Sequence, residues 1–219
     1  TQKAGFDMHI HVDADGSTRT VLDAFQRAFA RIGNKGSRHT ICHNTMVHPS
    51  DLPRYRAMGV LANATPLWAT DYDGVYRKSY EKRIGKQRIE ERLFPYGDLQ
   101  RSGAIVTYGA DIPGVDLPEI APLIQLEAAV TRKRPGFPND EPLVARQRVS
   151  VAEALRNYTW NGAYQLRLED RIGSIETGKL ADLVLLGANL FEVQPERIHT
   201  VPVLLTLMDG RATHEALPG

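Results

Sequence analysis

Two imidazoles and one carboxylate, carried by His11, His43 and Asp111, each follow a separate apolar segment of this sequence. Imidazole and carboxylate groups suit zinc or a similar divalent ion, so these side chains could form a metal site if they met around one point. The competing interpretation is structural, because a histidine at the end of a strand usually packs or lies on the surface. Asp111, which precedes Ile112-Pro113, would then be a turn residue.

The choice of histidine stays open at two of these positions. His9 and His11 share one face of an extended segment because side chains alternate, and His39 and His43 present the same ambiguity. Cys42 neighbours His43 in sequence but points to the opposite face of a strand. A nucleophilic Cys–His pair is therefore not expected here.

Apolar segments that alternate with helical segments are expected to position these side chains. Periodicity and turn residues predict strands at 6–12, 38–43, 60–64 and 104–108 and helices at 19–32, 49–59, 76–92, 95–102, 117–131 and 151–166. Continuous apolar strands alternating with helices imply a parallel sheet covered on both faces. Because parallel α/β folds place function at the carboxyl ends of their strands, the three side chains are expected at one edge.

The pattern changes after residue 170, where two glycine-bounded strands are expected at 180–186 and 203–208. These strands predict a separate β element. The sequence therefore divides into residues 1–170, with the alternating strands and helices, and residues 171–219.

Composition bounds the class of protein. The 219 residues carry a net charge of +1. This charge is too small to indicate binding to nucleic acid or to an anionic membrane. No apolar run approaches the roughly 20 residues that span a bilayer. The single cysteine cannot form an internal disulfide, and residues 1–5 lack the apolar core of a signal peptide. We therefore expect a cytoplasmic protein that binds neither nucleic acid nor membrane.

Four stretches make the chain similar to the amidohydrolase superfamily, in the branch called amidohydrolase family 3. Residues 9–16 resemble the fifth barrel strand of that family, where a histidine ligand is followed four residues later by an aspartate. Residues 38–43 resemble the sixth strand, which ends in a ligand histidine, and residues 103–113 resemble the eighth strand with its catalytic aspartate. Residues 173–184 are similar to the entry into the C-terminal β domain of the family.

The resemblance implies an α/β fold, the C-terminal part of a TIM (β/α)₈ barrel. Residues 1–170 would supply strands five to eight, and residues 171–219 would add a segment of a small, composite β-sandwich domain. The implied metal ligands are His11, His43 and Asp111, with zinc the first choice of metal, and Asp111 is the implied catalytic residue. Asp15, His39, Trp68 and Asp71 are expected around the site, where they would support a ligand or contact substrate.

The activity implied by the resemblance is metal-dependent hydrolysis of an amide or cyclic-amide C–N bond in a small molecule. A divalent metal lowers the pKa of water from ~15.7 towards ~7, and Asp111 would pass the water's proton to the leaving nitrogen. The sequence departs from the family in two ways. The His-x-His pair of strand one and the lysine or acid of strand four have no place here, and Trp68 stands where many relatives have histidine.

These departures keep alternatives open. The chain could be a catalytically inactive portion that serves as a binding or assembly module, or a different metal hydrolase that is complete in these residues. Exposed strand edges invite pairing with another chain. We therefore expect either a homo-oligomer or association with the missing N-terminal half of the barrel.

Overall fold

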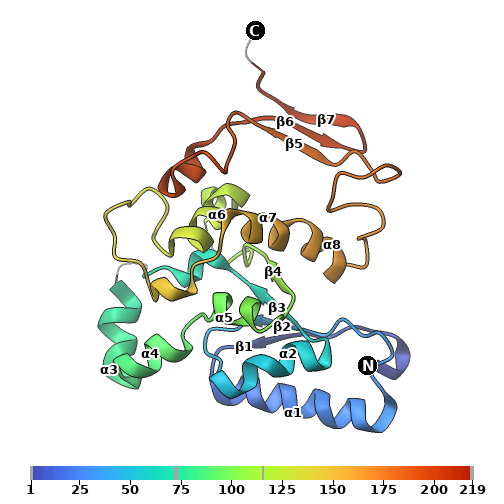
Figure 1. The fold of residues 1–219 in the computed structure, drawn as a ribbon, viewed down its shortest axis with the longest axis vertical. Helices are drawn as coiled ribbons and strands as arrows, with labels where there is room; N and C mark the ends of the chain where they lie inside the picture. The colour runs from blue at the N-terminus through green and yellow to red at the C-terminus, as the bar shows by residue number, and fades with distance from the viewer. Residues whose placement is uncertain (1, 72–73, 115, 218–219) are drawn as a thin grey trace.

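Two β-sheets organise the chain in the computed structural model, which describes residues 2–71, 74–114 and 116–217. The first is a four-stranded sheet and the second a three-stranded sheet (Figure 1). Figure 1 shows α1 and α2 against one side of the first sheet, with the second sheet at the opposite end of the molecule. The predicted α/β class is confirmed, and the strands predicted after residue 170 lie in an antiparallel sheet of their own.

The first sheet is parallel throughout and has the order β1-β2-β3-β4. Its strands are β1 (His9–Val12), β2 (Thr40–His43), β3 (Leu61–Ala64) and β4 (Val106–Tyr108). His11 pairs with Cys42, and Cys42 pairs with Asn63. Because all the strands run the same way, the residues that follow each strand gather at one edge of the sheet.

Helices connect the parallel strands. They are α1 (Asp15–Ile32), α2 (Leu52–Met58), α3 (Glu81–Ile84), α4 (Lys86–Arg92), α5 (Tyr96–Arg101), α6 (Pro122–Thr131), α7 (Val151–Tyr158) and α8 (Trp160–Gln165). Short 3-10 turns lie at Gln2–Ala4, Pro49–Asp51, Pro66–Ala69, Leu117–Ile120, Ala145–Gln147 and Pro195–Thr200, and a π turn lies at Tyr76–Tyr80. Among the described residues, no helix has both the length and the apolar character needed to cross a membrane.

The second sheet is antiparallel, with the order β5-β6-β7. Its strands are β5 (Leu183–Leu186), β6 (Val203–Met208) and β7 (Arg211–Glu215). The sequence did not predict β7, whose residues are all exposed and so leave no apolar alternation. The hairpin before it turns on Asp209 and Gly210, which both take positive φ angles of 50° and 75°, as a tight two-residue turn requires.

Several predicted boundaries were wrong for local reasons. α1 begins at Asp15 instead of residue 19, because the Ser17 hydroxyl bonds the backbone of Ala14 and starts the helix outside the apolar repeat. The predicted helix 76–92 is broken at Gly85, whose φ of 82° is not helical. The predicted helix 117–131 divides at Ala121, which precedes Pro122 and is therefore extended.

The expectation of a sheet covered on both faces holds for β4 but is wrong for β1. All three residues of β4 are buried, whereas His9 and His11 of β1 are exposed and Val12 is buried. One face of β1 packs on the core, and the opposite face lies open because no element of the described residues covers His9 and His11.

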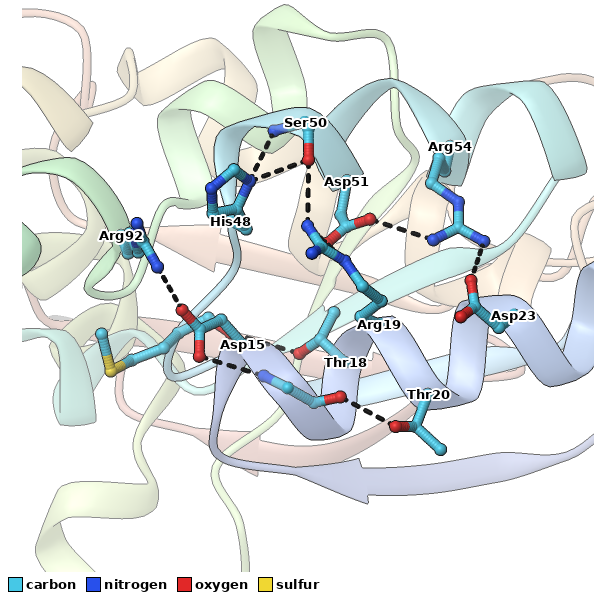
Figure 2. A network of polar contacts seen from close by, with 12 residues as sticks. Asp15, Thr18, Arg19, Thr20, Asp23, His48, Ser50, Asp51, Arg54 and Arg92 are labelled. Carbon is cyan, nitrogen blue, oxygen red and sulfur yellow. Dashed lines mark hydrogen bonds and ion pairs between the residues drawn. The ribbon is translucent and has the colours of Figure 1, made fainter.

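Ion pairs fasten α1 to the segment that follows β2 (Figure 2). Arg19 donates to Asp51 over 2.9 Å, and Arg54 donates to Asp51 over 2.9 Å and to Asp23 over 2.6 Å. Asp51 is almost fully buried between the two arginines. This network fixes α1 relative to α2 next to the carboxyl ends of β1 and β2.

His39 joins α1 to the sheet at the opposite end of β2. Its ring stacks on Phe25 at 4.8 Å and on Phe29 at 5.7 Å between centroids, and its Nδ1 accepts the Met8 N–H over 3.1 Å. Burial lowers the pKa of His39, and the nearby Asp7 carboxylate only partly opposes this effect. His39 is therefore neutral in the folded protein at neutral pH.

A neutral buried histidine makes the fold sensitive to acid. Because the folded pKa of His39 lies below its unfolded value of about 6.5, the unfolded chain binds the proton first, and stability falls as the pH drops below that value. We expect urea unfolding to show less loss of stability between pH 7.5 and 5.5 in His39→Gln than in the wild type. An equal loss in both proteins would contradict this assignment.

Candidate metal and catalytic site

The carboxyl edge of the parallel sheet opens into a cavity of about 260 Å³. It is lined by His11, Asp13, His43, Thr45, Trp68, Tyr76, Tyr80, Phe94 and Asp111. The structure thus brings the three side chains singled out as ligands in the sequence into one cavity. Their role as metal ligands stays a prediction.

The two imidazoles lie against each other. The ring centroids of His11 and His43 are 4.4 Å apart, and the planes meet at 65°. His43 pairs with Val12 in the sheet, so a regular strand would direct its side chain towards the buried face of Val12. His43 lines the cavity instead because the backbone leaves the strand there, with φ of 67° at His43 and 51° at Asn44.

Buried hydrogen bonds hold this left-handed turn. The side-chain nitrogen of Asn44, Nδ2, donates to the backbone carbonyls of Ile41 and Asn63, each over 2.9 Å. The side-chain oxygen of Asn44 accepts from the Tyr55 hydroxyl over 2.6 Å. Asn44 and Tyr55 are fully buried. Left-handed backbone at a non-glycine residue costs on the order of 1–3 kcal/mol, so it persists where its surroundings over-determine it.

A second buried tyrosine supports the same turn. The Tyr96 hydroxyl donates to the backbone carbonyl of His43 over 3.1 Å. Arg132, which is fully buried, donates to the carbonyls of Leu143 over 2.8 Å and Phe94 over 3.3 Å. Burial lowers the pKa of Arg132 to about 10, which still leaves the guanidinium charged at neutral pH. Its bonds fix Phe94 in the wall of the cavity.

Asp111 enters the cavity from the loop after β4 and is held by Trp68. The Trp68 Nε1–H donates to Asp111 Oδ2 over 3.0 Å. Asp111 also takes a left-handed φ of 57°, and its carbonyl accepts the Gly114 N–H. A Cβ at Gly114 would lie 2.8 Å from that carbonyl oxygen, so the turn needs glycine at this position.

Five lining residues were not singled out from the sequence, namely Asp13, Thr45, Tyr76, Tyr80 and Phe94. Asp13 is the one among them with a carboxylate. Its Oδ2 lies 2.9 Å from His11 Nε2, and its Oδ1 accepts the Thr45 hydroxyl over 3.1 Å. Burial alone would raise the pKa of Asp13, but the hydrogen bonds from His11 and Thr45 outweigh it and lower the pKa. The available signal was its place directly after strand one, two residues beyond His11.

Three of the residues expected around the site do not line the cavity. Asp15 is bound by Arg92 over 2.5 Å (Figure 2) and by Arg88 over 3.0 Å, so its carboxylate faces α4. His39 precedes β2 and lies at the far end of that strand. Asp71 accepts the Tyr76 N–H over 2.9 Å and borders a separate cavity of about 580 Å³.

The chemistry of the donors fits a divalent metal. Two imidazoles and two carboxylates surround the cavity, and such nitrogen and oxygen donors suit zinc. Across residues 2–71, 74–114 and 116–217, no three histidine, cysteine, aspartate or glutamate side chains stand in a ready-made metal cluster. Binding would therefore require a change of side-chain rotamer within the cavity.

The fold of this chain matches part of several larger solved structures. An uncharacterized metal-dependent hydrolase from Pyrococcus horikoshii aligns with a TM-score of 0.70 and 23% identity, over 89% of this chain and 36% of that one. An adenosine deaminase from Xanthomonas campestris with bound zinc aligns with a TM-score of 0.65 and 18% identity, over 98% of this chain and 47% of that one. At these identities the likeness shows the fold alone.

The sequence then gives the family directly. A sequence model described as the amidohydrolase family matches residues 1–214, and the chain belongs to amidohydrolase family 3, as the resemblance predicted. Protein LONG AFTER FAR-RED 3 of Arabidopsis thaliana is 27% identical over 95% of this chain and 34% of its own length. The putative amidohydrolase YtcJ of Bacillus subtilis is 24% identical over 98% of this chain and 38% of its own.

An enzyme is also among the relatives. The N-substituted formamide deformylase of Arthrobacter pascens is 26% identical over 97% of this chain and 37% of its own length. The chain therefore spans a little over one third of the curated relatives it matches.

The position of Asp15 predicts that its loss affects stability and not metal binding. Asp15→Ala would leave Arg88 and Arg92 without their shared carboxylate and remove an acidic residue from the first turn of α1. We expect a loss of about 1–2 kcal/mol in unfolding free energy. Zinc affinity, measured by chelator competition, should stay within twofold of wild type. A tenfold loss of affinity would instead place Asp15 at the site.

The hydrogen bonds of the Asn44 turn predict that one substitution lowers both the stability of the fold and its affinity for zinc. Tyr55→Phe removes the hydroxyl that satisfies the buried Asn44 oxygen, which should cost about 1–3 kcal/mol of stability. Because the turn directs His43, zinc affinity should fall as well. Tyr158→Phe, at a half-buried tyrosine on α7, serves as the control and should leave zinc affinity unchanged. Destabilisation of Tyr55→Phe with full zinc affinity would show that the turn does not position His43.

Proposed function

We propose that this chain carries part of the active site of a metal-dependent hydrolase that cleaves the C–N bond of an amide or cyclic amide. The observation that carries the proposal is the convergence of His11, His43 and Asp111, from the ends of three parallel strands, on one cavity. Membership of amidohydrolase family 3 and the formamide deformylase among its relatives support this substrate class.

The proposal includes the architecture. We assign β1 to β4 to strands five to eight of a (β/α)₈ barrel, and residues 171–219 to a segment of a small β-sandwich. The alignment of nearly all of this chain with under half of larger hydrolases supports this assignment. The open face of β1 would then be covered by the other strands of the barrel, or by a second copy of the chain.

His11, His43 and Asp111 would hold the metal in this proposal. A divalent metal, when bound, supplies a Lewis acid and makes water acidic enough to react at neutral pH. Asp111 accepts the proton of the attacking water and delivers it to the leaving nitrogen. The Trp68 N–H holds Asp111 Oδ2 in place, which directs the carboxylate into the cavity for this transfer.

Aromatic side chains form the remaining wall of the cavity. Tyr76 lies 5.1 Å from Tyr80 and 5.2 Å from Phe94 between ring centroids, in edge-to-face contacts. Burial raises the pKa of Tyr76, so its hydroxyl stays protonated. Together with Trp68, these rings provide an apolar surface for the organic part of a substrate and limit the access of water to it.

Two observations favour a second candidate function, an inactive binding or assembly module. The described residues contain no ready-made metal cluster, and one face of β1 is exposed together with Val184 and Leu185 of β5. A chain of this kind would fold without metal and use its exposed surfaces to associate with another chain.

Metal content separates the two candidates. We expect the purified protein to bind about one zinc ion per chain by mass spectrometry, and His43→Ala to lose at least tenfold in zinc affinity by chelator competition. His214→Ala, at an exposed histidine on β7 outside the cavity, is the matched control and should bind as wild type. A folded wild-type chain that binds no zinc, cobalt or manganese would contradict the hydrolase proposal and favour the module.

A further inference from the structure

The carboxylate of Asp13 is fixed by the strand next to its own. Its Oδ1 accepts the hydroxyl of Thr45, which follows β2 and is largely buried. The carbonyl of Thr45 in turn accepts the Phe94 N–H over 2.7 Å. Asp13 is thus held in position by the loop after β2, although 67% of its side chain is exposed to the cavity and solvent.

The direction of the contact with His11 follows from the chemistry of the carboxylate. An ionised carboxylate can only accept hydrogen bonds, so His11 Nε2, which lies 2.9 Å from Asp13 Oδ2, must be the donor. In a neutral imidazole one nitrogen carries the proton and the other keeps its lone pair. A proton on Nε2 therefore leaves Nδ1 as the nitrogen that can bind a metal.

His11 has little else to set its orientation. Its side chain is 64% exposed, and its ring contacts His43 edge-on. His43, in contrast, is positioned through its own backbone by the buried Asn44 turn. An exposed imidazole without a fixed partner would sample both tautomers and several rotamers, and only some of them would place a lone pair in the cavity.

We infer that Asp13 is the positioning residue of His11: it holds the proton on Nε2 and presents Nδ1 to a metal. Ligand histidines commonly donate their second ring N–H to a carboxylate in this way, and loss of that partner typically weakens metal affinity or activity 10–100-fold. The metal-binding half of this inference rests on the proposed function, whereas the position of the proton does not.

The same geometry explains why Asp15 does not fill this role. Asp15 is already bound by Arg88 and Arg92 of α4, which turn its carboxylate away from the cavity. Asp13, two residues earlier, lies between the ends of β1 and β2, within reach of both His11 and Thr45. The geometry of the loop after β1 therefore decides that Asp13, and not Asp15, contacts the imidazole of His11.

The test begins with the metal-free protein, so that it does not depend on the proposed function. Nitrogen-15 NMR at pH 8 distinguishes the two imidazole tautomers, and His11→Gln assigns the His11 signals. We expect the Nε2–H tautomer of His11 in wild type and a mixture in Asp13→Ala. Asp13→Asn keeps an acceptor oxygen and should retain most of the tautomer preference. Asp23→Ala, a carboxylate of α1 that pairs with Arg54, is the matched control.

Zinc affinity by chelator competition supplies the second readout. Asp13→Ala should bind zinc 10–100-fold more weakly than wild type, Asp13→Asn should lie between the two, and Asp23→Ala should match wild type. Circular dichroism confirms that each variant is folded.

The possible outcomes separate the two proposals. An unchanged His11 spectrum in Asp13→Ala overturns the inference about Asp13. Equal zinc affinity in Asp13→Ala and in a wild type that does bind zinc overturns it as well. Loss of the tautomer preference in a protein that binds no zinc in any form overturns the proposed function and supports the assignment of the proton to Nε2. Thr45→Val, which removes the second bond to Asp13, should weaken the tautomer preference less than Asp13→Ala does.

Discussion

The left-handed turn after β2 is the constraint on which the arrangement of the cavity depends. The buried Asn44 amide bridges the carbonyls of Ile41 and Asn63, and the Tyr55 hydroxyl completes its hydrogen bonding. This turn takes His43 off the face that its strand register would give it. The turn also brings Thr45 into contact with Asp13. Both imidazoles therefore depend on the turn, His43 through its own backbone and His11 through the Asp13 carboxylate.

Side-chain hydrogen bonds link neighbouring strands near the carboxyl edge of the parallel sheet. Thr45 bonds Asp13 between β2 and β1, and Asn44 bonds Asn63 between β2 and β3. Trp68 bonds Asp111 between the ends of β3 and β4. The backbone hydrogen bonds between strands stop where the strands end. Beyond that point these three side-chain contacts fix the loops. The result is a set of loops that carry reactive side chains on a rigid base, as α/β folds commonly do.

Family membership gives these contacts a chemical setting. The amidohydrolase fold gathers side chains from several strand ends. Each hydrogen bond between neighbouring loops therefore reduces the motion of one candidate metal-binding side chain relative to the others. β1 differs from the other strands because one of its faces is open. His9 and His11 are exposed on that face, which a closed barrel would cover. Assembly with further strands would bury that face and lower the local dielectric around the donors, which strengthens every charge interaction there.

Sequence by itself determined the family, the α/β class, the parallel strands and the three side chains His11, His43 and Asp111. The class and the parallel strands follow from apolar periodicity and from the alternation of strands with helices. The family follows from four stretches that resemble amidohydrolase family 3, and this resemblance chose His11 over His9 and His43 over His39 as the predicted ligands. Tertiary structure alone decided that Asp13 approaches His11, that Asp15 turns to arginines over 70 residues away, and that Trp68 bonds Asp111. Asp13 is only two residues from His11, but its carboxylate is fixed by Thr45 from the loop after β2. The other two outcomes join residues 43 or more positions apart. A pattern of neighbouring residues does not encode such long-range contacts.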